Sequence, residues 1–186
     1  MTSTRRIVLR IKKGTDGRTS LSCERADGTT TWQRQQGGQA RFFPRHDLTH
    51  YAVETVLGHR NGFYGLVASG WDLSDFGTPW PRGEIPKDAN VTEIIVGFFD
   101  RERASGQMGA AEEINDEVAQ FAEENGLPAP EPLSEDDLSR VRKRRGELFA
   151  QWAAVRPGDT LELAFDPAAL APSVGDQGLR SGAGPT

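Results

Sequence analysis

Two histidines, His46 and His50, are four residues apart, and two carboxylates accompany them. On a helix each residue turns by about 100°, so His50 and Glu54 lie about 40° and 80° from His46, and Asp47 lies about 100° from it. The apolar residues of this segment fall on the opposite side. Two imidazoles at this spacing can reach one metal ion from a single helix. The pattern predicts a divalent-metal site, with zinc as the expected ion.

The chemistry predicted for such a site is hydrolysis by metal-activated water. His46 and His50 are the expected ligands. Glu54 is the expected third ligand, and Asp75 is the alternative. Asp47 is the expected catalytic residue, either as the general base or as a carboxylate that orients a ligand. These assignments predict a metal-dependent hydrolase and leave its substrate open.

Two resemblances accompany this motif. The segment from His46 to His50 is similar to the His-Glu-x-x-His helix of the zincin metalloproteases, with Asp47 in place of the glutamate. In that family the acidic residue is the general base, and the resemblance implies this role for Asp47. The longer stretch from Phe42 to Asp75 resembles a group of small uncharacterised bacterial proteins with a His-Asp-Leu-x-His-x-x-Val-Glu helix. That resemblance implies a bacterial origin and no particular substrate.

The same residues also have interpretations without a metal. Asp47 in the first turn of a helix would complement the helix dipole. His50 and Glu54 would then pair across one turn on a solvated face. A metal-free acid–base or binding site is a further alternative. His59, which follows the predicted helix, either joins the site or lies in the turn after it.

A second hypothesis rests on the long aromatic loop at 71–86. Trp71, Asp72, Asp75 and Trp80 are the candidate binding residues of a non-enzymatic module that holds a protein partner or a small ligand. The competing interpretation of the two aspartates is a local turn in which their side chains bond to the backbone.

Hydrophobic periodicity predicts the elements that position these residues. Apolar side chains at every second position predict a three-stranded antiparallel meander within 5–34 and a strand at 159–165 that completes its sheet. A period of about 3.6 residues predicts four helices. These helices are expected near 44–58, 92–104, 110–125 and 134–155. The fold class is therefore α+β, with a small antiparallel sheet packed against about four helices.

The chain is expected to form one domain, followed by a tail. Residues 1–165 carry the periodic patterns, and their length suffices for one domain with its own core. Residues 166–186 are rich in proline, glycine, alanine and serine and show no periodicity, so they are predicted to be a disordered tail.

Composition excludes several classes of protein. The net charge of −5 argues against nucleic acid or an anionic membrane as the partner. The basic run at 140–145 is interpreted as a solvated helix face. Cys23 is the single cysteine and is predicted to be a buried core thiol. No apolar run reaches the roughly 18 residues of a membrane span, and no signal peptide is recognisable, so a cytoplasmic protein is expected.

Overall fold

The computed structural model describes residues 5–170. The part of the chain that it describes contains four strands, five α-helices and one short 3-10 helix. In chain order these are β1 (Ile7–Lys13), β2 (Thr19–Arg25), β3 (Thr30–Gln35), α1 (Gly38–Leu57), α2 (Phe63–Ala68), η1 (Leu73–Phe76), α3 (Lys87–Ser105), α4 (Ala111–Asn125), α5 (Glu135–Ala154) and β4 (Thr160–Phe165). The predicted α+β fold class is confirmed.

The four strands form one antiparallel sheet in the order β3-β2-β1-β4. Side chains alternate between its two faces, and one face carries the buried aliphatic residues Ile7, Leu9 and Ile11 of β1. Leu9 lies between Cys23 of β2 and Leu163 of β4 in the register. The predicted meander and the C-terminal strand that completes it are therefore confirmed.

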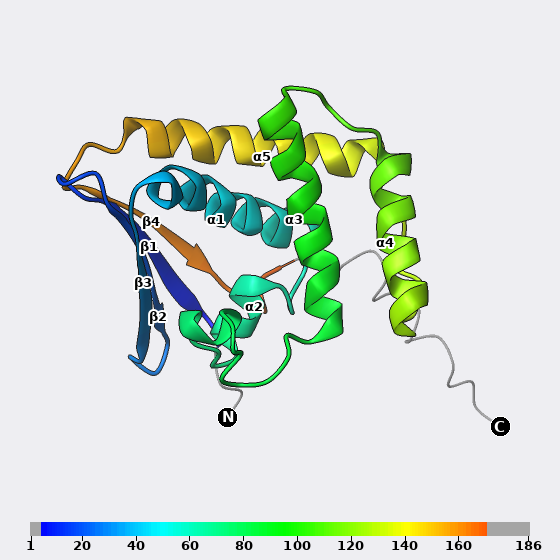
Figure 1. The fold of residues 1–186 in the computed structure, drawn as a ribbon, viewed down its shortest axis with the longest axis horizontal. Coiled ribbons are helices and arrows are strands. Elements are labelled where there is room, and N and C mark those ends of the chain that lie inside the picture. The colour runs from blue at the N-terminus through cyan, green and yellow to red at the C-terminus, as the bar shows by residue number, and fades with distance from the viewer. Residues whose placement is uncertain (1–4, 171–186) are drawn as a thin grey trace.

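The helices lie on one side of this sheet, and α1 is the long helix next to it (Figure 1). Helix α1 lies next to the sheet, and its Tyr51 hydroxyl donates a hydrogen bond of 2.7 Å to the carbonyl oxygen of Ala164 in β4. Helices α3 and α5 pack against α1, and α4 packs against α3. Because α1 touches the sheet and both of these helices, its side chains can meet groups from several elements.

Two helix starts differ from the prediction, and one further helix is present. Helix α1 begins at Gly38 and runs through Pro44. Its additional turns place Phe42 and Phe43 against the ring of His46. Helix α3 begins at Lys87, and in its first turns Ala89 is buried and Val91 packs against the core. Helix α2 has six residues, which is too short to show a 3.6-residue pattern in the sequence.

The predicted tail begins with an ordered turn. The backbone N–H of Ala169 donates to the carbonyl oxygen of Asp166 over 3.0 Å, and Leu170 packs against the core. The carbonyl oxygen of Leu170 also accepts a hydrogen bond of 3.0 Å from the guanidinium of Arg60. The rest of the predicted tail, residues 171–186, lies outside the described residues.

The basic run on α5 differs in part from the predicted solvated face. Arg142 and Arg145 extend to α3, where Glu102 is buried with 7% of its surface exposed. Arg142 contacts the Glu102 carboxylate at 2.5 Å, and Arg145 contacts it at 3.4 Å. The Arg145 guanidinium also donates to the carbonyl oxygen of Phe99. Arg142 and Arg145 therefore hold α3 against α5, whereas Arg140 and Lys143 of the same run are exposed, as predicted.

The single cysteine lies in the core, as predicted. Cys23 is buried in β2 with none of its surface exposed, and this burial raises the pKa of its thiol to about 12. Because the thiolate is the nucleophile, we expect iodoacetamide near pH 8 to alkylate the folded protein at least about 100-fold more slowly than the denatured protein. Mass spectrometry over time measures both rates, and equal rates would contradict the burial of this thiol.

Candidate metal centre

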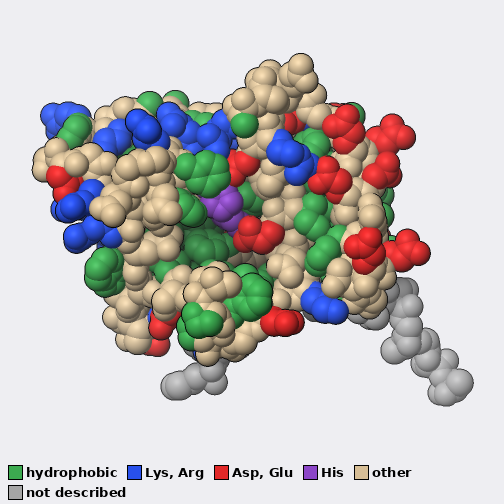
Figure 2. All heavy atoms as spheres, in the orientation of Figure 1, with side chains coloured by type: hydrophobic (Ala, Val, Ile, Leu, Met, Phe, Trp, Pro, Cys, Tyr) green, Lys and Arg blue, Asp and Glu red, His purple; other side chains and the backbone are tan. Residues whose placement is uncertain are grey.

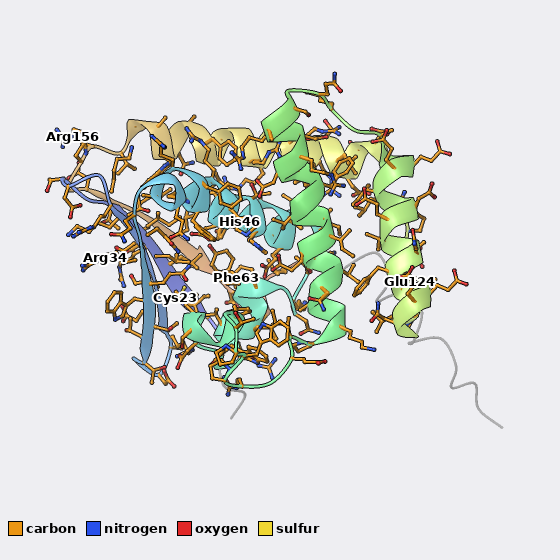
Figure 3. The ribbon with its side chains drawn as sticks, viewed as in Figure 1. Cys23, Arg34, His46, Phe63, Glu124 and Arg156 are labelled. Carbon is orange, nitrogen blue, oxygen red and sulfur yellow. The ribbon has the colours of Figure 1, made fainter. Side chains whose placement is uncertain are left out.

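Three side chains from two helices lie close enough to hold one metal ion. His46 and His50 come from α1, and their Nε2 atoms are 3.2 Å apart. Glu93 comes from α3, and its Oε1 atom lies 3.4 Å from Nε2 of His50. All three potential ligand atoms lie within 4.8 Å of one another. Figure 3 labels His46 on α1 where this helix faces α3.

These separations fit the shell of a divalent ion. Donor atoms about 2.1 Å from one ion are about 3.4 Å apart in a tetrahedron and about 3.0 Å apart at neighbouring corners of an octahedron. The His46–His50 and His50–Glu93 separations fall in this range. The Glu93 side chain is 39% exposed, so it has room to turn its carboxylate toward an ion. Two imidazoles and one carboxylate would leave further coordination positions for water or substrate.

Each histidine presents its other ring nitrogen to a carboxylate. Nδ1 of His46 lies 2.7 Å from Oδ2 of Asp100 on α3, and Nδ1 of His50 lies 3.6 Å from Oε1 of Glu54. The hydrogen bond to Asp100 favours the His46 tautomer with its proton on Nδ1, which leaves the Nε2 lone pair free for a metal. Nδ1 of His50 has no hydrogen-bond partner among the described residues, so Glu54 acts on this ring through its charge. With a lone pair on each Nε2 atom, His46 and His50 would both point toward the position of one metal ion.

The position of Glu54 corrects its predicted role as the third ligand. Its carboxylate is fully buried and faces Nδ1 of His50, on the side of the ring away from Nε2. Both of its oxygens accept hydrogen bonds of 3.1 Å from backbone N–H groups at the start of α2, those of Tyr64 and Gly65. Glu54 therefore lies behind His50, and Glu93 takes its place in the group that could hold an ion.

A glycine leaves the room that Glu54 needs. A Cβ atom on Gly62 would lie 2.6 Å from Cδ of Glu54 and 2.9 Å from its Oε2. We expect Gly62→Ala to displace this carboxylate and to lower zinc affinity by about 10- to 100-fold, the usual effect of losing a group that orients a ligand. Competition with a chromophoric chelator measures the change.

Gly97→Ala is the matched control, since its added Cβ has only the Arg101 guanidinium within 4 Å, at 3.9 Å. Gly97→Ala should leave zinc affinity unchanged. If Gly62→Ala also leaves it unchanged, Glu54 does not support the site.

Asp47 lies beside the metal group rather than within it. Its residue is 3% exposed, and no described residue donates a hydrogen bond to its carboxylate. Burial raises the pKa of Asp47 to about 7. The carboxylates that face the Nδ1 atoms belong to Asp100 and Glu54, so the orienting role predicted as one option for Asp47 is corrected. Its other predicted role, that of general base, stays a prediction.

Burial contradicts the interpretation of this stripe as a solvated helix face. His50 is 1% exposed and Glu54 is fully buried. Burial by itself would lower the pKa of His50, but the carboxylates of Glu93 and Glu54 outweigh this effect and raise the pKa to about 10. In turn His50 lowers the pKa of Glu93 in spite of the burial of that carboxyl group. The cluster of carboxylates thus favours a positive charge at this position.

The two aspartates of the aromatic loop form a local turn. The Asp75 side chain accepts a hydrogen bond of 2.8 Å from the backbone N–H of Asp72, which caps η1. Oδ1 of Asp72 accepts a hydrogen bond of 2.9 Å from Arg25 of β2. The alternative ligand role of Asp75 is therefore replaced by a capping role. The competing interpretation, the turn, agrees with the structure.

The remaining candidates lie outside the metal group. Trp71 packs against Phe76 with ring centroids 5.5 Å apart, and Trp80 is 42% exposed. Nδ1 of His59 lies 2.9 Å from the Thr92 hydroxyl oxygen. His59 lines a separate cavity of about 210 Å³ between α3, α4 and the segment before α5. It belongs to the turn after α1 and not to the metal group.

The sequence analysis missed Glu93 and Asp100. Both lie on α3 and are seven residues apart, a spacing that places two residues on one side of a helix. This spacing was the available signal, but exposed carboxylates at such spacings are common on helices. Only the packing of α3 against α1 shows which face meets the histidines.

Comparison of the chain with protein-family models, curated proteins and solved structures found no match. No helix within residues 5–170 has the length and apolar character needed to cross a membrane.

Proposed function

We propose that this protein binds one divalent metal ion, with zinc as the expected ion, through His46, His50 and Glu93, and acts as a metal-dependent hydrolase. The observation that carries the proposal is the pairing of each histidine with a carboxylate. Nε2 atoms 3.2 Å apart converge while each Nδ1 faces Asp100 or Glu54. Carboxylate–histidine–metal arrangements of this kind are a regular feature of metal centres in proteins.

A divalent ion with two histidines and one carboxylate supplies an acidified water and polarises the bond to be cleaved. The chain's own residues would fix the geometry. Asp100 would hold the His46 ring in its tautomer and orientation through a hydrogen bond of 2.7 Å. Glu54 would act on His50 through its charge from 3.6 Å, and α2 holds Glu54 in place through two backbone N–H groups. The rigid attachment of both histidines to one helix adds to this fixed arrangement.

Asp47 is the proposed general base. Its carboxylate has no hydrogen-bond donor among the described residues, so its lone pairs are available for a proton. The variant Asp47→Asn should keep the bound ion and lose metal-dependent hydrolysis. A variant that loses the ion as well would show that Asp47 supports the site instead.

Metal analysis of the native protein tests the proposal. After purification without an affinity tag, we expect about one ion per chain in the parent protein and less than about 0.1 in the variant His46→Ala/His50→Ala. Both proteins should show the same far-ultraviolet circular dichroism. Absence of metal from the parent protein, with no change in melting temperature on adding zinc, manganese, iron or nickel, would overturn the proposal.

A further inference from the structure

A chain of aromatic rings crosses the metal group and joins α1 to the loop after α2. On one side Phe42 stacks on His46, with ring centroids 5.3 Å apart and an interplanar angle of 22°. On the other side Phe63 lies 5.1 Å from the His50 ring and 4.6 Å from Phe76. Rings therefore flank both of the histidine ligands.

The metal group lies beside a hollow in the surface. Figure 2 shows a hollow beside a histidine near the middle of this face, with hydrophobic side chains at its rim and floor and an acidic side chain next to the histidine. Figure 3, in the same orientation, labels His46 at that place and Phe63 just below it. Phe42 is 41% exposed, and Phe76 is only partly buried. The metal group thus lies at a hollow with hydrophobic side chains around it, and the rings in contact with the two histidines are those of Phe42 and Phe63.

The charges around the hollow do not favour an anion. Glu93, Glu54, Asp100 and the buried Asp47 are four carboxyl groups at or beside the histidines. Arg103 is the basic residue in contact with this group, and its guanidinium is already 3.2 Å from Asp100. The negative charges of these groups would offset the positive charges of a divalent ion and of Arg103. Little positive charge is then left to bind a phosphate or a carboxylate of a ligand. Lys and Arg side chains gather instead along the upper and left edges of this face (Figure 2).

On this basis, and resting on the proposed metal site, we propose that the substrate is uncharged and carries a flat apolar group next to the bond that is hydrolysed. Its apolar group would lie against the rings of Phe42, Phe63 and Phe76 while its polar group meets the metal. Aromatic surfaces favour such groups by burial and by ring–ring contact. The loop that was a candidate for ligand binding on its own would then form one wall of the metal site, through Phe76 and its neighbour Trp71.

Two small zinc ligands test this proposal on the zinc-loaded protein. Acetohydroxamic acid and benzohydroxamic acid bind zinc through the same group, but only the second carries a ring. We expect benzohydroxamic acid to bind at least about 10-fold more tightly by isothermal titration calorimetry. Phe42→Ala and Phe76→Ala should each reduce this ratio. Trp32→Ala, which removes a ring that is 62% exposed on the outer face of the sheet, should leave it unchanged.

The other outcomes are distinguishable. Equal affinities for the two hydroxamic acids, or a preference that survives both phenylalanine substitutions, would overturn the aromatic substrate class while leaving the metal site in place. A protein that takes up no zinc would overturn the proposed function, and this inference with it.

Discussion

Replacing Glu93 by alanine is expected to lower zinc affinity by more than about 100-fold. Loss of a residue that only orients a ligand costs about 10- to 100-fold, and the loss of a direct ligand should cost more. Glu93 has a 39% exposed side chain, so its removal leaves the core untouched. Because Glu93 also stabilises the charged form of the buried His50, the melting temperature of the metal-free variant should fall, while its far-ultraviolet circular dichroism should stay the same. Competition titration with a chromophoric zinc chelator measures the affinity.

Two further variants separate the ligand from the supporting carboxylates. Asp100→Asn and Glu54→Gln keep the shapes of their side chains, and each should lower zinc affinity by about 10- to 100-fold. Asp88→Ala is the matched control, since it removes an exposed negative charge from the same helix outside the metal group. If Glu54→Gln has a larger effect than Glu93→Ala, the ligand would be Glu54, as the sequence alone suggested.

The contrast between Glu54 and Glu93 shows what the sequence can predict for this site. His46, His50 and Glu54 are within one helix, so their common side follows from helical geometry alone. That geometry could not show which ring nitrogen Glu54 faces. Which ring nitrogen Glu54 faces depends on α2, whose backbone N–H groups at Tyr64 and Gly65 hold the Glu54 carboxylate.

The sheet was predictable for a similar reason. The alternation of Ile7, Leu9 and Ile11 is a local property of the chain, and the turn residues between the strands favour antiparallel neighbours. Glu93 and Asp100 differ from these residues because their role depends on how α3 packs against α1. Contacts between helices distant in sequence leave no comparable periodic signal.

The packing of α3 leads to the second large effect, which concerns Glu102. We expect Glu102→Ala to lower the free energy of unfolding by about 3–5 kcal/mol, because Arg142 and Arg145 would keep their buried charges without a partner. The side chains of these arginines are only 16% and 13% exposed. Glu102 also accepts a hydrogen bond of 3.0 Å from the backbone N–H of Gly109, which would be lost as well. Urea denaturation measures the change.

Glu117→Ala provides the matched control for this prediction. Glu117 of α4 pairs with Arg101 of α3 at 2.5 Å, yet both side chains are about half exposed. Removing this surface pair should cost less than about 1 kcal/mol. Similar losses in the two variants would contradict the role assigned to Glu102. Because α3 carries both Glu93 and Asp100, Glu102→Ala should also weaken zinc binding, whereas Glu117→Ala should not. The attachment of α3 to α5 would then be a condition for the metal site as well as for stability.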